Sequence, residues 1–471
     1  MYLHKIRLEN IKCFENIEFD FTYGRNKPRL MTVILGDNGV GKTTLLQAIA
    51  ITLGGEKVTN FLLKSPSTLY GPDLDSWTRA GSKLGEIRAT IYPGKSDEDA
   101  PKHKCQASYL ATGDEPVETK DGTFYDRSSI SVMPNKDLQI LRRTAYADHT
   151  QGWLACGYGP LRGFTGQRIF ETKDTKSSRF ASLFGQNDQL ISVEDWLIEL
   201  DRRDFIDKRD KGTSNYRHIY NQLASTLLRM LPEEQYPAAI SVNMPPELAP
   251  ANVSTHVKTT TDQGVLWLDS FGNWVTFSQL SDGYQSMMSL AGDLVSRLSR
   301  AFPETSNLLN QEGVVLIDEI DIHLHPTWQR KILTQLRQTF PKIQFIVTTH
   351  SPLVAASAKE DELFVLKEEQ KRVVVEQAFF VQGWRADQIL TSSLFDLDTT
   401  RDPETEHQLA RYDDLLAIRA RGELSADQTQ ELAVLEKELG KKLPTGDTPE
   451  QRQLYQEMRN YITQTLREKG E

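Results

Sequence analysis

One short segment constrains this chain more than any other. The residues Gly36-Asp37-Asn38-Gly39-Val40-Gly41-Lys42-Thr43 fit the pattern G-x-x-x-x-G-K-[ST]. The segment follows the apolar run 30–35, which has the length of a buried strand, and precedes the run 43–53, whose apolar residues recur at helical spacing. The pattern is informative when it lies between a strand and a helix, and this segment has that setting. We therefore expect an α/β core that holds a phosphate-bearing ligand.

The residue types of this phosphate loop suit the phosphates of ATP. Glycines let backbone N–H groups turn inward around phosphate oxygens, and the helix N-terminus adds its positive dipole end. We expect the Lys42 ammonium to reach the β- and γ-phosphates and the Thr43 hydroxyl to bind Mg²⁺. The full set of ATP contacts expected here is Gly36, Asn38, Gly39, Gly41, Lys42, Thr43 and Thr44.

Two later apolar runs end in polar residues that complete such a site. The run 314–317 is followed by Asp318 and Glu319. We expect Asp318 to bind Mg²⁺, partly through water, and Glu319 to act as the general base on the attacking water. The run 345–347 leads to His350, which we expect at the γ-phosphate. A histidine after a strand is more often structural, so this role depends on the phosphate loop upstream.

The segment Leu280-Ser281-Asp282-Gly283-Tyr284-Gln285 precedes the helix expected over 279–299. The phosphate loop, this segment, the Asp-Glu strand and the histidine, in this order, resemble the motifs of the ABC-type ATPase superfamily. The resemblance identifies residues 280–285 as the signature segment. It implies that Ser281 and Gly283 contact the γ-phosphate held by a second subunit, in a head-to-tail dimer or a higher oligomer.

The signature departs from the commonest form, because Asp282-Gly283-Tyr284 stands where two glycines and a glutamine are usual. This variant resembles the RecF/SMC/OLD-like branch and disfavours a transporter subunit. The opening strands, with residues 8–14, are similar to that branch too, and there Lys12 would lie near the phosphates. The superfamily also has a glutamine that binds the metal, and Gln167 is our candidate for it.

The resemblance implies an α/β fold of the ABC-ATPase head type. We expect a P-loop NTPase core with an antiparallel N-terminal β-subdomain, an inserted helical lobe and a helical C-terminal tail. Residues 55–150 read as irregular, with long surface loops. The expected division is 1–60 for the first half of the ATPase core, 61–259 for the inserted lobe, 260–381 for the second half of the core, and 382–471 for a helical partner-docking region.

Composition narrows the class of protein further. The formal net charge is −10, which argues against a protein that coats nucleic acid in bulk but leaves room for a local basic groove. No apolar run is long enough to span a membrane, and the first residues lack the features of a signal peptide. Cys13, Cys105 and Cys156 are too widely spaced for a disulfide framework or a metal motif. We expect a cytoplasmic protein with no membrane partner.

Two small clusters allow a second interpretation. His323 and His325 lie near acids and could suggest a metal site, but the segment resembles the dimer-contacting loop of the superfamily. Asp396 and Asp398 form a DxD pair in the tail, which we interpret as a solvated loop rather than a nuclease centre.

The chain shows neither the long coiled coil of SMC proteins nor the C-terminal nuclease domain of OLD proteins. It therefore looks like an ATPase without nuclease activity of its own, and it resembles the PtuA-like ATPase subunits of Septu and retron anti-phage systems. The tract 382–395 carries part of that resemblance. The family implies a separate nuclease partner of the HNH type, with DNA or a phage component as further candidate partners. The alternative is a RecF-like DNA repair ATPase.

The acidic tail has two interpretations. Residues 382–471 carry more Asp and Glu than Lys and Arg, and the last helix has an apolar stripe from Leu454 to Leu466. The stripe either docks a basic protein partner or packs on the chain's own core.

Overall fold

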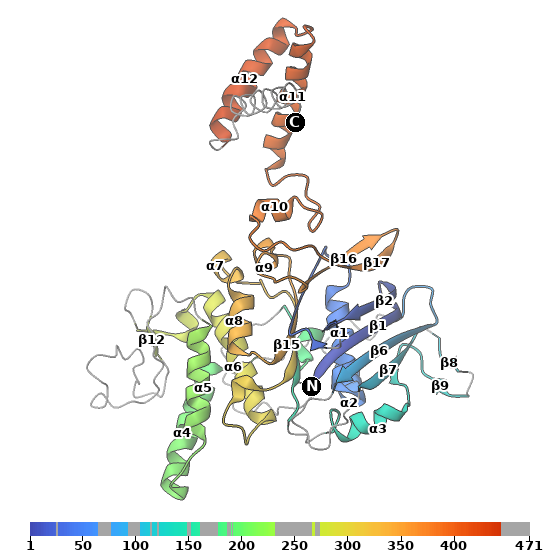
Figure 1. The fold of residues 1–471 in the computed structure, drawn as a ribbon, viewed down its shortest axis with the longest axis vertical. Helices are drawn as coiled ribbons and strands as arrows, with labels where there is room; N and C mark the ends of the chain where they lie inside the picture. Colours follow the sequence, from blue (N-terminus) through green and yellow to red (C-terminus); the bar gives the residue numbers. More distant parts are fainter. Residues whose placement is uncertain are drawn as a thin grey trace, which may run out of the picture. The chain divides into compact units, whose positions relative to one another are not determined.

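The computed structural model describes residues 1–24, 27–64, 77–92, 104–113, 115–119, 122–147, 152–160, 178–185, 190, 192–230, 266–268 and 274–443. The chain forms two compact units, Met1–Ile389 and Leu390–Glu471. The first unit contains two β-sheets and a group of helices (Figure 1). Helix α10 (Ala386–Leu390) spans the point where the units divide. The finer division expected from the sequence stays a prediction.

The central sheet of the first unit has the strand order β11-β14-β15-β5-β16-β17. Every neighbouring pair is parallel except β16 and β17. The strands are β5 (Met31–Gly36), β11 (Ala155–Tyr158), β14 (Gly313–Ile317), β15 (Ile343–Thr348), β16 (Leu363–Glu369) and β17 (Arg372–Gln377). Strands β14 and β15 are buried at every residue, which explains why most of their residues are apolar.

The second sheet is antiparallel and has the order β10-β7-β6-β1-β2. Its strands are β1 (Tyr2–Ile11), β2 (Phe14–Asp20), β6 (Leu84–Tyr92), β7 (Cys105–Thr112) and β10 (Ile130–Val132). The expectation of irregular structure over 55–150 was wrong, because β6 and β7 extend the opening hairpin over long registers. The sequence between these two strands is rich in polar residues, and for that reason the alternation of apolar residues within the strands was overlooked.

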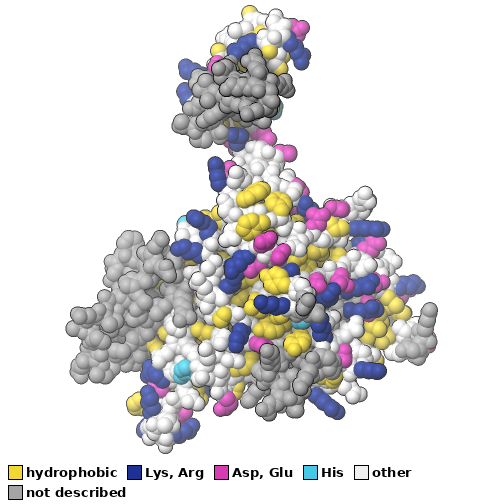
Figure 2. Space-filling model, viewed as in Figure 1, with side chains coloured by type: hydrophobic (Ala, Val, Ile, Leu, Met, Phe, Trp, Pro, Cys, Tyr) yellow, Lys and Arg dark blue, Asp and Glu magenta, His cyan; other side chains and the backbone are white. Residues whose placement is uncertain are grey.

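The exposed face of the antiparallel sheet carries charges of both signs. Lys5 pairs with Glu18 at 3.0 Å across β1 and β2, and Arg88 pairs with Glu86 along β6. Figure 2 shows Lys and Arg side chains interleaved with Asp and Glu over this part of the molecule. Mixed charge of this kind favours solubility and gives no single-sign surface for a polyanion.

Helix α1 (Lys42–Gly54) lies between the two sheets and contacts strands of both. Most of its residues are buried, and its sequence is apolar on all sides because both faces are covered. The main hydrophobic core joins this helix to the buried faces of the two sheets. The core therefore converges on the helix that begins at the phosphate loop.

The other described elements surround these sheets. Beside α1 and the antiparallel sheet are α2 (Glu56–Lys64), α3 (Lys136–Arg143) and the short pairs β3 (Thr22–Tyr23) with β4 (Lys27–Pro28) and β8 (Val117–Glu118) with β9 (Phe124–Tyr125). Elsewhere are η1 (Ala181–Phe184), α4 (Val193–Lys211), α5 (Tyr216–Arg229), β12 (Leu266–Leu268), β13 (Trp274–Thr276), η3 (Phe277–Gln279), α6 (Asp282–Ala301), η4 (Leu308–Asn310), α7 (Pro326–Gln329), α8 (Ile332–Thr339) and α9 (Pro352–Ala355). None of the described helices is long and apolar enough to cross a membrane.

The second unit contains the helices α11 (Pro403–Ala420) and α12 (Ala426–Lys442). Ser425 and Gln428 form a capping box at the start of α12. Leu432 and Leu439, which share one face of α12, pack with Leu415 in a small separate core. The stripe Leu454–Leu466 lies outside the described residues, so the choice between docking and self-packing stays open.

We expect Leu415→Ala to unfold the second unit and to leave the first unit folded. Leu415 is fully buried in the small core, and such truncations cost about 2–5 kcal/mol. Circular dichroism should show partial loss of helix at a lower temperature than the main transition. Leu397→Ala, at a leucine that is 46% exposed, is the matched control and should change little. If Leu415→Ala also abolished the unfolding transition of the first unit, the conclusion that the two units have separate hydrophobic cores would be wrong.

Candidate functional site

The phosphate loop lies between β5 and α1, at the carboxyl end of the central sheet. Gly39 and Gly41 have φ angles of 86° and 97°, which L side chains rarely adopt. Asn38 and Gly39 are exposed, Gly36 and Thr44 are half-buried, and the backbone of this segment opens directly into the N-terminus of α1. The loop therefore has the backbone shape and the helix dipole that favour an anion.

Lys42 is buried at the first position of α1. Its ammonium donates hydrogen bonds to the carbonyl oxygens of Gly36 and Asp37, each at 2.8 Å. Burial lowers the pKa of Lys42 below its ordinary value, while the nearby carboxylates of Asp318 and Glu319 oppose that shift. The Lys42 ammonium is thus bound to the backbone of the phosphate loop and lies near Asp318 and Glu319, the two acids expected from the sequence.

Asp318 is the centre of the hydrogen bonding at this edge of the sheet. It is fully buried directly after β14, and one carboxylate oxygen accepts a hydrogen bond of 2.6 Å from the Thr43 hydroxyl. The other oxygen accepts a hydrogen bond of 2.5 Å from the Thr348 hydroxyl at the end of β15. The structure therefore brings together Thr43 and Asp318, which are 275 residues apart in the sequence.

The residues after Asp318 are held by the end of β15. The Glu319 N–H donates to the Thr348 hydroxyl at 2.7 Å, and Glu319 has a left-handed φ of 47°. A non-glycine residue in this conformation is strained by about 1–2 kcal/mol, so the surrounding contacts must hold it there. The half-buried Glu319 side chain starts from a fixed backbone beside Asp318.

His350 follows the same strand end and is half-buried. Asp321 accepts a hydrogen bond of 2.5 Å from the Thr349 hydroxyl and one of 3.4 Å from the His350 N–H. Asp321 therefore ties the loop after Asp318 to the segment that carries His350. Sequence reasoning named neither Asp321 nor Thr348 as a site residue; their only signal was a position next to the end of an apolar run.

The N-terminal sheet contacts the phosphate loop through the turn between β1 and β2. A Cβ atom on Gly41 would meet Cys13 Sγ and lie 2.7 Å from Phe14 Cζ, so this glycine is required by packing as well as by φ. The Cys13 thiol also lies 3.6 Å from the Val40 carbonyl oxygen. Lys12 has a φ of 45°, and its ammonium lies 4.9 Å from the centre of the Trp77 ring.

The signature segment forms the N-terminus of α6. Ser281 and Asp282 are exposed, and Ser281 occupies the N-cap position without a side-chain cap hydrogen bond. A Cβ atom on Gly283 would lie 2.9 Å from the His323 carbonyl oxygen, so the segment approaches the loop after Asp318 closely. Tyr284 packs edge-on against Trp328, with ring centres 4.6 Å apart. The structure thus joins the signature to the loop where we expected a dimer contact.

The remaining candidates have simpler outcomes. His325 caps α7 by accepting from the Thr327 N–H, and the described residues contain no group of three or more His, Cys, Asp or Glu side chains that could hold a metal ion. Asp396 and Asp398 are exposed, as expected for a solvated loop. Gln167 lies outside the described residues, so its role stays a prediction.

Comparisons with known proteins show what the chain is similar to. Residues 31–356 match the family model described as "AAA domain, putative AbiEii toxin, Type IV TA system". The chain is 25% identical over 465 residues to the Septu protein PtuA of Bacillus mycoides (strain KBAB4), covering 98% of this chain and 54% of that protein. It therefore spans about half the length of that relative.

Two further similarities have been found. The Retron Ec83 probable ATPase of Escherichia coli is 25% identical over 418 residues, covering 78% of this chain and 71% of that protein. Among solved structures, an Smc head domain from Pyrococcus furiosus with an extended coiled coil matches 80% of this chain and 96% of its own length, at 14% identity and a TM-score of 0.44.

We expect Gly41→Ala to destabilise the ligand-free protein more than Gly39→Ala. Both positions have positive φ, but a Cβ atom meets Cys13 and Phe14 only at Gly41, whereas nothing lies within 4 Å at Gly39. The extra cost is that of overpacking, about 1–3 kcal/mol. Denaturant unfolding of both variants measures the difference. Equal losses would show that φ alone explains the need for glycine and that the turn before Phe14 does not press on the loop.

Proposed function

This chain belongs to the AAA domain family (putative AbiEii toxin, Type IV TA system), and on that premise we propose that it binds and hydrolyses ATP as the PtuA-like subunit of a Septu or retron anti-phage system. The observation that carries the ATPase part is the 2.6 Å contact between Thr43 on the phosphate loop and the buried Asp318. It joins the loop that would hold phosphates to the strand end that would bind their metal. The similarity to PtuA and to a retron ATPase supports the defence role.

The residues at the site fit ATP and Mg²⁺. The glycines with positive φ leave the loop backbone open to phosphate oxygens, and Lys42 supplies the buried positive charge. The Thr43 hydroxyl and the Asp318 carboxylate are hard oxygen donors that lie close together, so they could bind the same magnesium ion, directly or through water. When bound, Mg²⁺ neutralises charge that develops on the transferred phosphate.

The chain's own groups would then carry out hydrolysis as follows. Glu319 would orient a water molecule and accept its proton. Its backbone is anchored on Thr348 beside Asp318, which supports this role. His350, held through Asp321, would contact the γ-phosphate from the neighbouring strand end. Thr348 bonds both Asp318 and Glu319, so it would keep the metal ligand and the base in one geometry.

The signature segment supports a site shared between two chains. Ser281 and Asp282 are exposed at the start of a long helix, and Ser281 makes no cap hydrogen bond of its own. Its hydroxyl and the helix N–H groups would therefore contact the γ-phosphate of a second copy, in a head-to-tail dimer or a higher oligomer. Lys12, Asn38 and Thr44 would add contacts to the nucleotide of their own subunit, and Gln167 would complete the metal shell.

The partner in this proposal is a separate nuclease, which the ATPase controls. In this proposal the chain has no nuclease activity of its own. An HNH-type nuclease is the candidate that the family resemblance suggests, and the tail from residue 382 onward would dock it. DNA or a phage component is a further candidate partner.

We expect Glu319→Gln to bind ATP but to hydrolyse it about 10²–10⁴-fold more slowly, because an amide cannot accept the proton from water. Phosphate release measures turnover, and size-exclusion chromatography with ATP should show the variant accumulating as a dimer. Glu368→Gln, at an exposed glutamate on β16, is the matched control and should retain turnover. Turnover at the normal rate in Glu319→Gln would assign the base to another group.

We expect the signature to act on a second subunit. A Lys42→Ala chain lacks the phosphate contact and a Ser281→Arg chain blocks the signature, so each should be inactive alone. Mixed dimers contain one composite site in which both intact elements meet, and ATPase activity should return to part of the normal value. If pull-down shows mixed dimers without recovered activity, each site is complete within one chain and the head-to-tail arrangement is wrong.

A further inference from the structure

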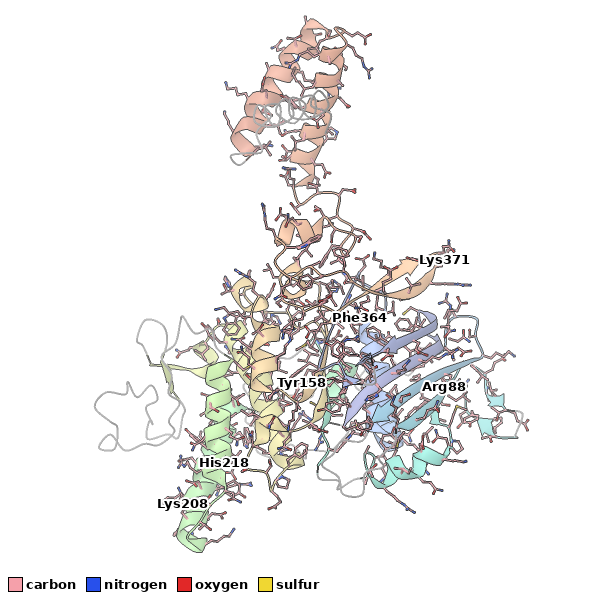
Figure 3. The ribbon with its side chains drawn as sticks, viewed as in Figure 1. Arg88, Tyr158, Lys208, His218, Phe364 and Lys371 are labelled. Carbon is pink, nitrogen blue, oxygen red and sulfur yellow. The ribbon has the colours of Figure 1, made fainter. Side chains whose placement is uncertain are left out.

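Tyr158 touches both the metal-binding strand end and the signature helix. It is the last residue of β11, and its carbonyl oxygen accepts a hydrogen bond of 2.8 Å from the Asp318 N–H. Its hydroxyl donates a hydrogen bond of 2.8 Å to Asp293, in the middle of α6. Figure 3 labels Tyr158 in the interior of the first unit, near the helices. One residue therefore connects Asp318 to the helix that begins after Ser281: its backbone bonds the Asp318 N–H and its side chain bonds Asp293.

The group around Tyr158 is charged and buried. Asp293 is fully buried and forms an ion pair with Arg297, one turn further along α6. Burial, and then the Asp293 charge, raise the pKa of Tyr158 well above its ordinary value, so its hydroxyl stays a donor. Burial raises the pKa of Cys156 to about 11, so this residue is a thiol, 3.8 Å from the Tyr158 oxygen.

Such a group is held in place strongly. A buried carboxylate must keep its partners, because an unsatisfied charge in the interior is very costly. The second carboxylate oxygen of Asp293 has no hydrogen-bond partner among the described residues, so Asp293 depends on Tyr158 and Arg297. Among the described residues, Tyr158 therefore links the Asp293 carboxylate to the central sheet.

Helix α6 is thus joined to the strand end of Asp318 at two points. At its N-terminus Gly283 lies against the His323 carbonyl, on the loop that follows Asp318. In its middle Asp293 bonds Tyr158, which pairs with Ile317 in the register of β11 and β14. Two attachments fix the direction of a helix as well as its position.

We propose that Tyr158 is a positioning residue that sets the orientation of the signature helix relative to Asp318, through its hydrogen bond to Asp293. This rests on the proposed function, in which Ser281 acts on the nucleotide of a second subunit. A tilt of α6 would displace Ser281 from that nucleotide without altering the phosphate loop of its own chain. Loss of the hydroxyl should therefore lower turnover and ATP-driven dimerisation while the affinity of one chain for ATP is kept.

The test compares Tyr158→Phe with Tyr109→Phe in the full-length chain. Tyr109 is an equally buried tyrosine on β7 of the other sheet, so its variant controls for the loss of a buried hydroxyl that does not bond the signature helix. We expect ATP affinity in both variants to stay within about twofold of the unsubstituted chain. Removal of a hydrogen bond to a charged group should lower kcat about tenfold in Tyr158→Phe alone. In a Glu319→Gln background, Tyr158→Phe should also weaken the ATP-held dimer about tenfold.

Arg297→Lys keeps the positive charge beside Asp293 and leaves the Tyr158 hydroxyl in place. Arg297→Lys should retain most of the turnover. This result would distinguish loss of the Tyr158 hydrogen bond from a general disturbance of the buried group around Asp293. The variant also remains informative if Tyr158→Phe folds poorly. Equal turnover in Tyr158→Phe and Tyr109→Phe would overturn the inference, and so would an equal loss in Arg297→Lys. An unsubstituted chain with no ATP turnover would instead refute the proposed function.

Discussion

The buried carboxylate of Asp318 is the interaction on which the rest of the site depends. A carboxylate in the interior is very costly unless it is hydrogen-bonded or paired with a positive charge. Here one oxygen accepts from Thr43 and the other from Thr348. This requirement holds the start of α1 and the ends of β14 and β15 together. The hydrogen bonds of Asp318 therefore stabilise the core of the protein and also arrange the site residues, and they do so in a structure without ligand.

The two sheets meet at the same place for a different reason. Helix α1 is covered on both faces, which puts the phosphate loop where the antiparallel sheet and the parallel sheet converge. The turn carrying Cys13 then closes on Gly41. A glycine in a phosphate loop is usually explained by its backbone conformation. In this protein it also leaves room for the neighbouring sheet, so the opening strands directly shape the loop.

Helix α6 is joined to the loop after Asp318 and to β11 by contacts that would be costly to break. Gly283 fits against the loop after Asp318. Inside the protein, Arg297 pairs with the Asp293 charge and Tyr158 donates a hydrogen bond to it. Buried polar contacts of this kind specify one arrangement of the helix rather than adding much net stability. The site that we propose to be shared between subunits would need such specificity, because the exposed end of α6 would have to face a second molecule accurately.

The sequence by itself determined the local chemistry of this protein. The phosphate loop, the strands ending at Asp318 and His350, and the helix beginning after Ser281 each follow from short-range pattern and spacing. The tertiary structure alone decided which of these ends meet, because strand order and register are set by packing over hundreds of residues. Thr348 lies opposite Asp318 only through the pairing of β14 with β15. The pairing of β6 with β1 was not predicted from the sequence. The contact between Tyr158 and Asp293 likewise depends on the packing of β11 against α6.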